Sequence, residues 1–564
     1  MMKIFTPQSK INIGLHPLAG IKSFQYGVWD IEAVDWWNLQ VIGCFDGTNY
    51  YWFRTVDRFL DHILQKKYSG FRWFAHFGGR YDMNFIFDRL QERGDTHVSF
   101  YCSGSMVIRM QIKKGRHTAY LCDSFRLLPA GLRQLTIAFN VEHKKTEYDF
   151  ASMVFGKELL EYNEQDCRGL YEVLYNFFEQ TGIRSETFAT HALRYWRKEF
   201  LQRTIWQPHE HISDFIRRSL FGGHVEVFKR HMVHGSCYDV NSMYPYVMQF
   251  PVPVDYIGES HRLLDQYYGF VECEVFIPDM YLPPLPVRLE KLFFPVGTVR
   301  GVWTTEELRE AEKRGVKILK INKAYYFKCE EIFKDYVHRL YKLKKTASEP
   351  TRTIAKYLLN SLFGKFGQHP EKKVFCTEKE APNGSFPIIK PDGNPSGFAE
   401  YSRRSRSAYL LPHISAAITS KARIVLLNSL TESSYYCDTD SIFTTSPMNT
   451  GNELGDWSLV GEGEATFYQP KLYKFRGEWK SKGLNRHLST CTNRDKCMCG
   501  SSTIDAFVQG DINQVIRHRS IKEALRQGLQ ATASIEINKT MGSTRPKRVW
   551  INDDTRPWNI EELI

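Results

Sequence analysis

The feature that most constrains this chain is a pair of aspartates inside a short β-rich run. Asp438 and Asp440 stand two residues apart, between an apolar stretch that begins at Tyr435 and another that ends at Phe443. Alternate residues of a strand point to the same face, so this spacing predicts that both carboxylates share one face of a sheet. Like charges so close repel each other unless a cation lies between them. The pattern favours a metal site, although an Asp-Thr-Asp sequence is also common in ordinary turns.

A third acid is expected at the end of another strand. Asp239 follows an apolar run, and Pro245 soon after it disfavours further strand pairing. Carboxylate oxygens are preferred ligands of Mg²⁺, and two divalent ions about 3.5 to 4 Å apart can activate an attacking oxygen and stabilise a leaving oxygen in phosphoryl transfer. Helix capping is the alternative for Asp239 taken alone.

A basic helix face separates these acids in the sequence. Glu349-Pro350 is a helix-start signal. After it, four polar or small residues recur every four positions: Arg352, Lys356, Asn360 and Gly364. Residues four apart lie on one face of a helix, and a cationic face of this kind suits a triphosphate. A solvated basic face is the alternative.

The first third of the chain carries a second set of acids. Asp30 and Glu32 lie two apart in an apolar run, Asp82 follows a glycine-rich segment, and Tyr162 precedes Asp166 by about one helical turn. Four acids with a nearby tyrosine can hold two metals and orient a water for phosphodiester hydrolysis. Acids on solvated strand ends and helix faces are the alternative for each one alone.

Length and composition set wider bounds. A chain of 564 residues predicts roughly three to five structural units. Its net charge of +12 favours nucleic acid as a partner as much as it favours mere solubility. There is no secretion signal and no apolar run of about 18 residues, which predicts an intracellular protein without a membrane span. The cysteines mostly stand singly in apolar segments, as reduced thiols do.

Periodicity predicts the organisation of the chain. Short β-rich runs alternate with helical segments to about residue 180, which indicates an α/β domain. Residues 185–218 read as mainly helical, and the remainder as mixed α and β. The turn-rich segment 370–397 predicts a protruding hairpin around the run 386–389.

Taken together, the motifs resemble those of proofreading family B DNA polymerases. The resemblance rests above all on three segments, Asp239–Pro245, Lys356–Gly364 and Tyr436–Ser441, and covers about residues 26 to 485. It implies a multidomain fold, α/β and α+β, in which an RNase H-like 3′–5′ exonuclease domain precedes a right-hand polymerase domain. The compact length points to the protein-primed subgroup of phages, viruses and linear plasmids.

The resemblance also implies domain boundaries. The first insertion resembles one that engages a priming terminal protein, and the second resembles one tied to processivity and strand displacement. The expected units are an exonuclease domain (1–185), a helical connection (186–218) and a polymerase domain (219–564) with palm (about 219–250 and 401–480), first insertion (251–327), fingers (330–366), second insertion (367–400) and thumb (481–564).

For the polymerase site, the resemblance implies roles for individual residues. Metal ligands are Asp239, Val240 and Asp440, with Asp438 as a catalytic helper. Nucleotide-binding residues are Tyr244, Lys344, Arg352, Lys356, Asn360 and Phe363, and among them Tyr244 excludes a ribose 2′-hydroxyl. DNA-binding residues are Gly222, Gly223, Lys471 and Tyr473. Phe363 and Leu220 stand where the family usually has Tyr.

For the exonuclease site, the implied metal ligands are Asp30, Glu32, Asp82 and Asp166. Tyr162 positions the water, and Lys145 assists catalysis, with Lys144 as its rival. Ser124 and Phe125 hold the single-stranded 3′ end. Where the family has an Asn shortly before the aspartate of the second motif, this chain has Phe77 or Gly78, so the grip on that end is expected to differ.

The implied cofactors are two Mg²⁺ or Mn²⁺ ions in each active site. The implied partners of this expected monomer are primer-template DNA, dNTPs, a terminal protein and a single-stranded DNA-binding protein, in a host cytoplasm or an organelle. A further cluster, His487, Cys491, Cys497 and Cys499, offers zinc ligands, but its spacing fits no standard finger, and solvated loop cysteines are the default.

Two other functions compete with a polymerase. One is a nuclease whose second half only binds DNA, and the other is a non-catalytic basic replication protein. The acids and basic helix of the second half argue against the first, and unneutralised carboxylates, which repel phosphate, argue against the second.

Overall fold

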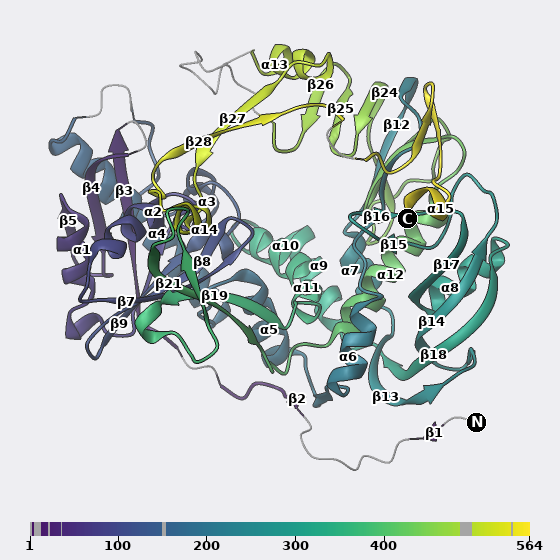
Figure 1. Cartoon of the computed structure of the whole chain (residues 1–564), viewed down its shortest axis with the longest axis horizontal. Coiled ribbons are helices and arrows are strands. Elements are labelled where there is room, and N and C mark those ends of the chain that lie inside the picture. Colours follow the sequence, from purple (N-terminus) through teal and green to yellow (C-terminus); the bar gives the residue numbers. More distant parts are fainter. Residues whose placement is uncertain are drawn as a thin grey trace.

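The structure is a computed structural model that describes residues 3–4, 13–20, 23–34, 37–148, 154–484, 499–542 and 545–564. Among these residues, three large sheets organise the chain, with ten, seven and five strands. Figure 1 shows the ten-stranded sheet on one side of the molecule and the other two on the opposite side. Between them lie the helices α5 (Phe188–Glu199), α9 (Lys334–Thr346), α10 (Thr351–Ser361) and α11 (Phe363–Phe366).

The ten-stranded sheet is the core of the N-terminal part. Its strands β3, β6 and β9 pair in parallel, and adjacent residues of β3 enter different cores, since Val28 packs beneath α4 (Lys157–Thr181) while Trp29 packs with α1 (Val56–Ile63) and α2 (Asp82–Glu92). The predicted α/β alternation is confirmed. Its strands from this part are β3 (Tyr26–Val34), β4 (Asn38–Phe45), β5 (Tyr50–Phe53), β6 (Arg72–Ala75), β7 (His97–Ser103), β8 (Met106–Lys114) and β9 (His117–Asp123).

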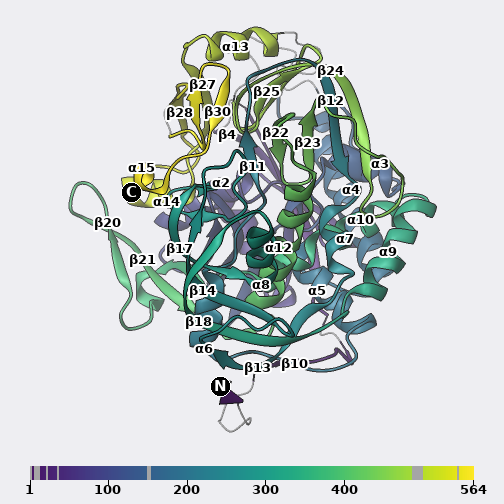
Figure 2. The same cartoon turned by 90° about the vertical axis from the view of Figure 1, so that its right-hand side faces the viewer.

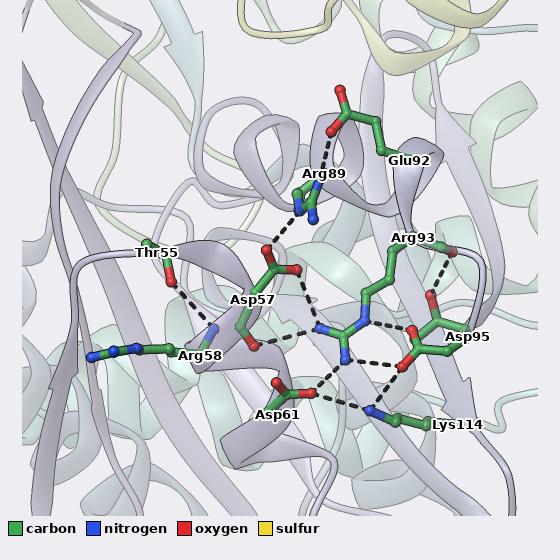
Figure 3. A network of polar contacts seen from close by, with 10 residues as sticks. Thr55, Asp57, Arg58, Asp61, Arg89, Glu92, Arg93, Asp95 and Lys114 are labelled. Atoms are coloured by element: carbon green, nitrogen blue, oxygen red, sulfur yellow. Dashed lines mark hydrogen bonds and ion pairs between the residues drawn. The ribbon is translucent and has the colours of Figure 1, made fainter.

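An ion-pair network ties α1 to α2 on the outside of this sheet (Figure 3). The Arg93 guanidinium, only 9% exposed, contacts the carboxylates of Asp57, Asp61 and Asp95. Lys114 on β8 joins the same group through Asp95, at 2.8 Å. One buried cation therefore holds three otherwise repelling carboxylates together.

The segment 367–400 extends the same sheet. Its hairpin of β20 (Phe386–Ile389) and β21 (Pro395–Arg404) protrudes as predicted, which Figure 2 shows clearly. The segment is not a separate projection, however, because β19 (Glu371–Thr377) pairs with both β21 and β7. The stacked rings of Phe100 and Phe375, 5.2 Å apart, reinforce that junction.

The seven-stranded sheet lies in the C-terminal part, and the buried helix α12 (Pro412–Ser429) packs on it. The sheet is antiparallel, in the order β11-β22-β23-β12-β24-β25-β26. Its strands are β11 (Val225–Val227), β12 (His231–Val240), β22 (Ser434–Asp438), β23 (Ser441–Thr444), β24 (Trp457–Gln469), β25 (Leu472–Phe475) and β26 (Glu478–Ser481).

The first insertion supplies four strands of the five-stranded sheet, which packs on the other side of α12, and β1 from the start of the chain joins its edge. Arg423 of α12 and Glu307 of α8 (Thr305–Lys313) make a buried ion pair at 2.6 Å across this junction. The strands are β1 (Lys3–Ile4), β13 (Val252–Ser260), β14 (Tyr268–Ile277), β17 (Gly297–Thr304) and β18 (Lys317–Glu330). The helical connection holds α5, α6 (Glu210–Arg217) and the strand β10 (Ile205–Trp206), so its helical prediction holds except at β10.

The last stretch of the chain divides between two places. The helix α14 (Ile521–Gln527) and the ribbon of β27 (Asn513–His518) and β28 (Ser534–Lys539) reach the N-terminal part, where α14 joins the core of α1 and α2. Residues 545–564 return to β11 and β17, and carry β29 (Val549–Ile551), β30 (Asp554–Arg556) and α15 (Ile560–Leu563). Among the described residues, no helix combines the length and apolarity that crossing a bilayer requires.

Candidate active sites

The three acids of the second half come together at one end of the seven-stranded sheet. Asp239 and Asp438 lie near the ends of β12 and β22, and both strands pair with β23 at Ser441. The prediction that Asp438 and Asp440 share one strand is wrong. Thr439 has φ 66°, so the chain reverses between β22 and β23 and places Asp440 in the connecting turn.

The turn holds its carboxylates close despite their repulsion. Burial and the neighbouring Asp239 and Asp438 raise the pKa of Asp440 to about 6. Burial also raises the pKa of Asp239, and Lys344 opposes the shift. The backbone of Val240 donates to the carbonyl of Asp440 at 2.8 Å and joins the two segments. An acid pair with raised pKa values is short of positive charge, so this donor set fits a divalent cation.

Asp438 differs from the other two acids because a lysine already neutralises it. Lys471 Nζ lies 2.6 Å from both carboxylate oxygens of Asp438. The hydroxyl of Tyr436 donates to the same carboxylate at 3.0 Å and accepts from the backbone of Lys471. Tyr473 packs its ring against Tyr436. The predicted DNA-binding residues Lys471 and Tyr473 therefore lie directly beside the acids.

The predicted nucleotide-binding residues lie across from these acids. Lys344 Nζ donates to Ser242 at 2.8 Å, and burial together with Lys356 lowers the pKa of Lys344. The ring of Tyr244 stacks on Phe363 with centroids 4.2 Å apart. The basic helix face is confirmed as a feature of α10 and α11, since its members are all exposed: Arg352, Lys356, Asn360 and Gly364.

The segment Phe221–His224 packs against the reversal at Thr439. The carbonyl of His224 accepts from the backbone of Thr439 at 2.8 Å. A Cβ atom on Gly223 would lie 2.6 Å from the Thr439 hydroxyl, so only glycine fits there, whereas the predicted partner Gly222 faces open space. Sequence reasoning missed Arg423, which donates to the carbonyls of Phe221 and Gly222. Its signal was an arginine in a helix that is apolar or small at most other positions.

The four acids of the first half also converge. One oxygen each of Asp30, Glu32 and Asp166 lies within 4.8 Å of the others. Asp82 begins α2 and accepts from the backbone of Ile31 at 3.1 Å, which holds it beside β3. Burial and the charge of Asp166 raise the pKa of Asp30 to about 7. Within the described ranges, no group donates to the buried Oδ1 of Asp166, and this set of oxygens fits a divalent cation.

Lys145, and not its rival Lys144, reaches these acids. Its amino group pairs with Asp166 and donates to the hydroxyl of Tyr162 at 2.8 Å. Burial lowers the pKa of Lys145, but Asp166 and Asp30 outweigh it and raise the pKa above its ordinary value. Lys144 is exposed, and its carbonyl accepts from Gln165.

An aromatic pair joins the loop between β6 and α2 to the turn that follows β9. The ring of Phe77, 38% exposed, stacks on Phe125 with centroids 4.0 Å apart. Ser124 is buried and donates to the carbonyl of Ala75. An added Cβ on Gly78 would lie 2.6 Å from the Ala75 Cβ, so an asparagine does not fit at that position.

The remaining predicted site cannot be assessed. His487, Cys491 and Cys497 lie outside the described residues, and of Cys499 only the backbone, at the start of α13 (Cys499–Val508), is described.

Comparisons with known proteins point to DNA polymerases. A family model described as DNA polymerase type B, organellar and viral, matches residues 151–388. A probable DNA polymerase of Ascobolus immersus is 27% identical over 510 residues, which cover 73% of this chain and 41% of that protein. The DNA-directed DNA polymerase of Enterobacteria phage PRD1 is 26% identical over 469 residues, 78% of this chain and 77% of that protein.

A solved structure supplies the fold. Phi29 DNA polymerase, in complex with primer-template DNA and incoming nucleotide substrates, matches with a TM-score of 0.68 at 17% identity, over 92% of this chain and 100% of that one. The chain spans only about half the length of its fungal relatives, between 41% and 52%. The predicted family is confirmed: the chain belongs to the family B DNA polymerases, in the protein-primed subgroup with organellar and viral members.

Proposed function

We propose that this chain is a DNA-directed DNA polymerase that extends a primer on a DNA template. The observation that carries the proposal is that Asp239 and Asp440 meet at the end of the sheet, with Lys344 beside Asp239 and Lys356 next to Lys344. Acids with raised pKa values suit metal-bound phosphates, and lysines opposite them suit the rest of a triphosphate. In this proposal the seven-stranded sheet with α12 is the palm, α9 to α11 are the fingers, and 481–564 supplies the thumb.

The protein's own groups divide the work. Asp239, Val240 and Asp440 would hold two divalent ions, which supply activation of the primer 3′-hydroxyl and neutralisation of phosphate charge. Lys356 and Arg352 grip the triphosphate from the exposed face of α10, with Asn360 beside them. Tyr244, held flat against Phe363, closes the space where a ribose 2′-hydroxyl would lie.

We also propose a 3′–5′ exonuclease in the N-terminal domain. Asp30, Glu32, Asp82 and Asp166 would hold its metals, because their oxygens converge and one of them lacks a donor among the described residues. The amino group of Lys145 keeps the Tyr162 hydroxyl beside Asp166, where it can orient a water. Ser124, Phe125 and the exposed ring of Phe77 would receive the 3′ end.

Paired substitutions separate the two activities. Asp440→Asn should abolish extension of a primed template and leave degradation of a single strand intact, and Asp30→Asn should do the reverse. Each variant is the control for the other, since both must fold to keep one activity. Extension unchanged in Asp440→Asn would refute the polymerase site, and degradation unchanged in Asp30→Asn would refute the exonuclease site.

Priming by a protein is the finer part of the proposal. It is supported by the family match and by the separate sheet of residues 251–327, which offers a docking unit next to α12. The chain, its terminal protein, labelled dATP and Mn²⁺ should yield a nucleotide covalently attached to a protein hydroxyl. Label only in free DNA would contradict priming by a protein but leave primer extension standing.

A further inference from the structure

The strand that supports the catalytic turn is short and lies at a sheet edge. β11 has three residues and pairs only with β22, with Val225 opposite Asp438 and Glu226 opposite Cys437. Its preceding residue, His224, accepts the backbone hydrogen bond of Thr439. So short an edge strand has few backbone hydrogen bonds to fix its position. The position of the turn at Thr439 nevertheless depends on it.

A buried charge anchors this strand. The Glu226 side chain is 1% exposed, and one of its oxygens lies 3.0 Å from Nε2 of His224 and 3.6 Å from Nη1 of Arg548. Burial raises the pKa of Glu226, but His224 and Arg548 outweigh it and leave the pKa below its ordinary value. A carboxylate buried this deeply is destabilising unless a cation accompanies it, so the loss of one partner leaves the other uncompensated.

Arg548 comes from the distant end of the described chain and is itself held tightly. Its guanidinium donates to the hydroxyl of Thr555 at 2.8 Å and to the carbonyl of Tyr281 at 2.9 Å. Thr555 in turn donates to the carbonyl of Phe228, just after β11, at 2.7 Å. Residues 548–555 therefore pack beside the edge strand and meet it with both backbone and side chain.

Residues 548–555 also contact the chain that follows β11. The backbone of Arg230 donates to the carbonyl of Asp553 at 2.8 Å, and Lys229 forms a β-bridge with Asp554. On the other side, the His224 ring stacks on Phe294 of the first insertion, with centroids 3.7 Å apart. The edge strand is thus enclosed by two segments that are far from it in the sequence.

We propose that Glu226 and Arg548 are positioning residues of the polymerase site: their buried ion pair holds β11, and through His224 it holds the turn that carries Asp438 and Asp440. The inference rests on the proposed polymerase function. Neither side chain touches the reacting groups. Losing the pair should shift the turn by a fraction of an ångström and slow nucleotide transfer, while the distant exonuclease acids keep their arrangement.

Three variants test the pair. Arg548→Met removes the arginine and leaves Glu226 with His224 and Lys547. Glu226→Gln leaves Arg548 without an acid beside it, and the double variant removes both members of the pair. Each single variant should lower the kcat of primer extension by about 10-fold to 100-fold, the scale that small misplacements cause, and raise the Mg²⁺ concentration needed for half-maximal extension. The double variant should recover part of the loss, since neither Glu226 nor Arg548 is then left without the other.

Controls distinguish positioning from general damage. Degradation of a single strand reports on the fold of the same molecule and should stay within about twofold. Arg556→Met removes an arginine just after residues 548–555. Its ion pair with Glu562 is partly exposed, so this variant should change neither activity. Should Arg548→Met fold poorly, Glu226→Gln and the double variant carry the test.

Several outcomes would overturn the inference. These are unchanged extension in both single variants, a parallel loss of extension and degradation, or a double variant no better than the singles. Two other results would refute the underlying polymerase proposal itself. These are no primer extension by the unmodified chain, or equal extension by the unmodified chain and by Asp440→Asn.

Discussion

At the scale of single residues, Asp438 and Asp440 have different environments although they stand only two residues apart. Asp440 lies beside Asp239 and Asp438, and its pKa rises to about 6, because burial and these like charges outweigh the opposing charge of Lys471. Asp438 is paired with Lys471 at 2.6 Å. This difference agrees with the roles that the resemblance implies, in which Asp440 holds metal and Asp438 assists.

The exposed ring of Phe77 yields a prediction at this scale. Its φ of 61° is a strained conformation for a residue with a side chain, and strain of this kind often marks functional positions. A ring stacked on Phe125 can support the last base of a single strand, a contact of about 1 to 3 kcal/mol. Phe77→Ala should therefore raise the KM for degradation of a single strand and leave its kcat unchanged.

Phe77→Tyr is the matched control and should keep the KM of the unmodified protein, because it keeps the ring. Fluorescence of 2-aminopurine at the 3′ end gives a reading without hydrolysis, because stacking quenches it. An unchanged KM and equal quenching in Phe77→Ala would exclude a stacking role.

At the scale of elements, ion pairs join neighbouring helices, because the backbone hydrogen bonds of a helix are made within that helix. The Arg93 network between α1 and α2 is one such junction, and its three acids range from 40% to 55% exposed while Arg93 is 9% exposed. Figure 3 shows the acids converging on the guanidinium from three directions.

Arg93→Met should lower the free energy of unfolding of the N-terminal domain by about 2 kcal/mol, between the values for exposed and buried pairs. Hydrogen bonds from Arg93 and Lys114 hold the pKa of Asp95 well below its ordinary value. A carboxylate with a lowered pKa stabilises the fold above its unfolded pKa of about 3.9 and loses that effect as the pH falls below it. The deficit of Arg93→Met should accordingly be full at pH 7 and shrink below about pH 4.

Urea unfolding followed by tryptophan fluorescence, to which the buried Trp29 and Trp73 of this domain contribute, measures this difference. Arg58→Met is the control, because Arg58 lies exposed on α1. Equal midpoints for Arg93→Met and Arg58→Met at pH 7 would show that the network contributes nothing.

At the scale of the whole molecule, the β27–β28 ribbon and α14 connect the C-terminal part to the N-terminal domain a second time (Figure 1). The carboxylate of Asp88 on α2 accepts from the backbones of Ala531 and Thr532, at 2.7 and 2.9 Å. Arg526 on α14 pairs with Glu400 on β21 at 2.9 Å. Such a closed connection can keep a polymerase on its DNA between additions.

Asp88→Ala should open this connection, because the two backbone donors lose their acceptor. We expect severalfold shorter products for each binding event, with the rate of single additions unchanged. Extension of a long primed template in the presence of a heparin trap measures the length, and Glu92→Ala, an exposed position on the same helix, is the control. Unchanged product length in Asp88→Ala would contradict a role in retaining DNA.

The sequence by itself determined which residues could carry chemistry. The spacing of acids, the four-residue period of Arg352, Lys356 and Asn360, and the order of motifs are local properties, so they could be interpreted without a fold. They also predicted the family correctly, and the periodicity predicted the α/β alternation of the first 180 residues.

The tertiary structure decided which of those residues meet. The reversal at Thr439 depends on the packing of Gly223, and the choice of Lys145 over Lys144 depends on α4. The pairs Lys471–Asp438 and Arg548–Glu226 join segments remote in sequence. Periodicity reports only on neighbours along the chain, whereas these contacts arise when separate sheets and segments pack, and burial then makes each charge require its partner.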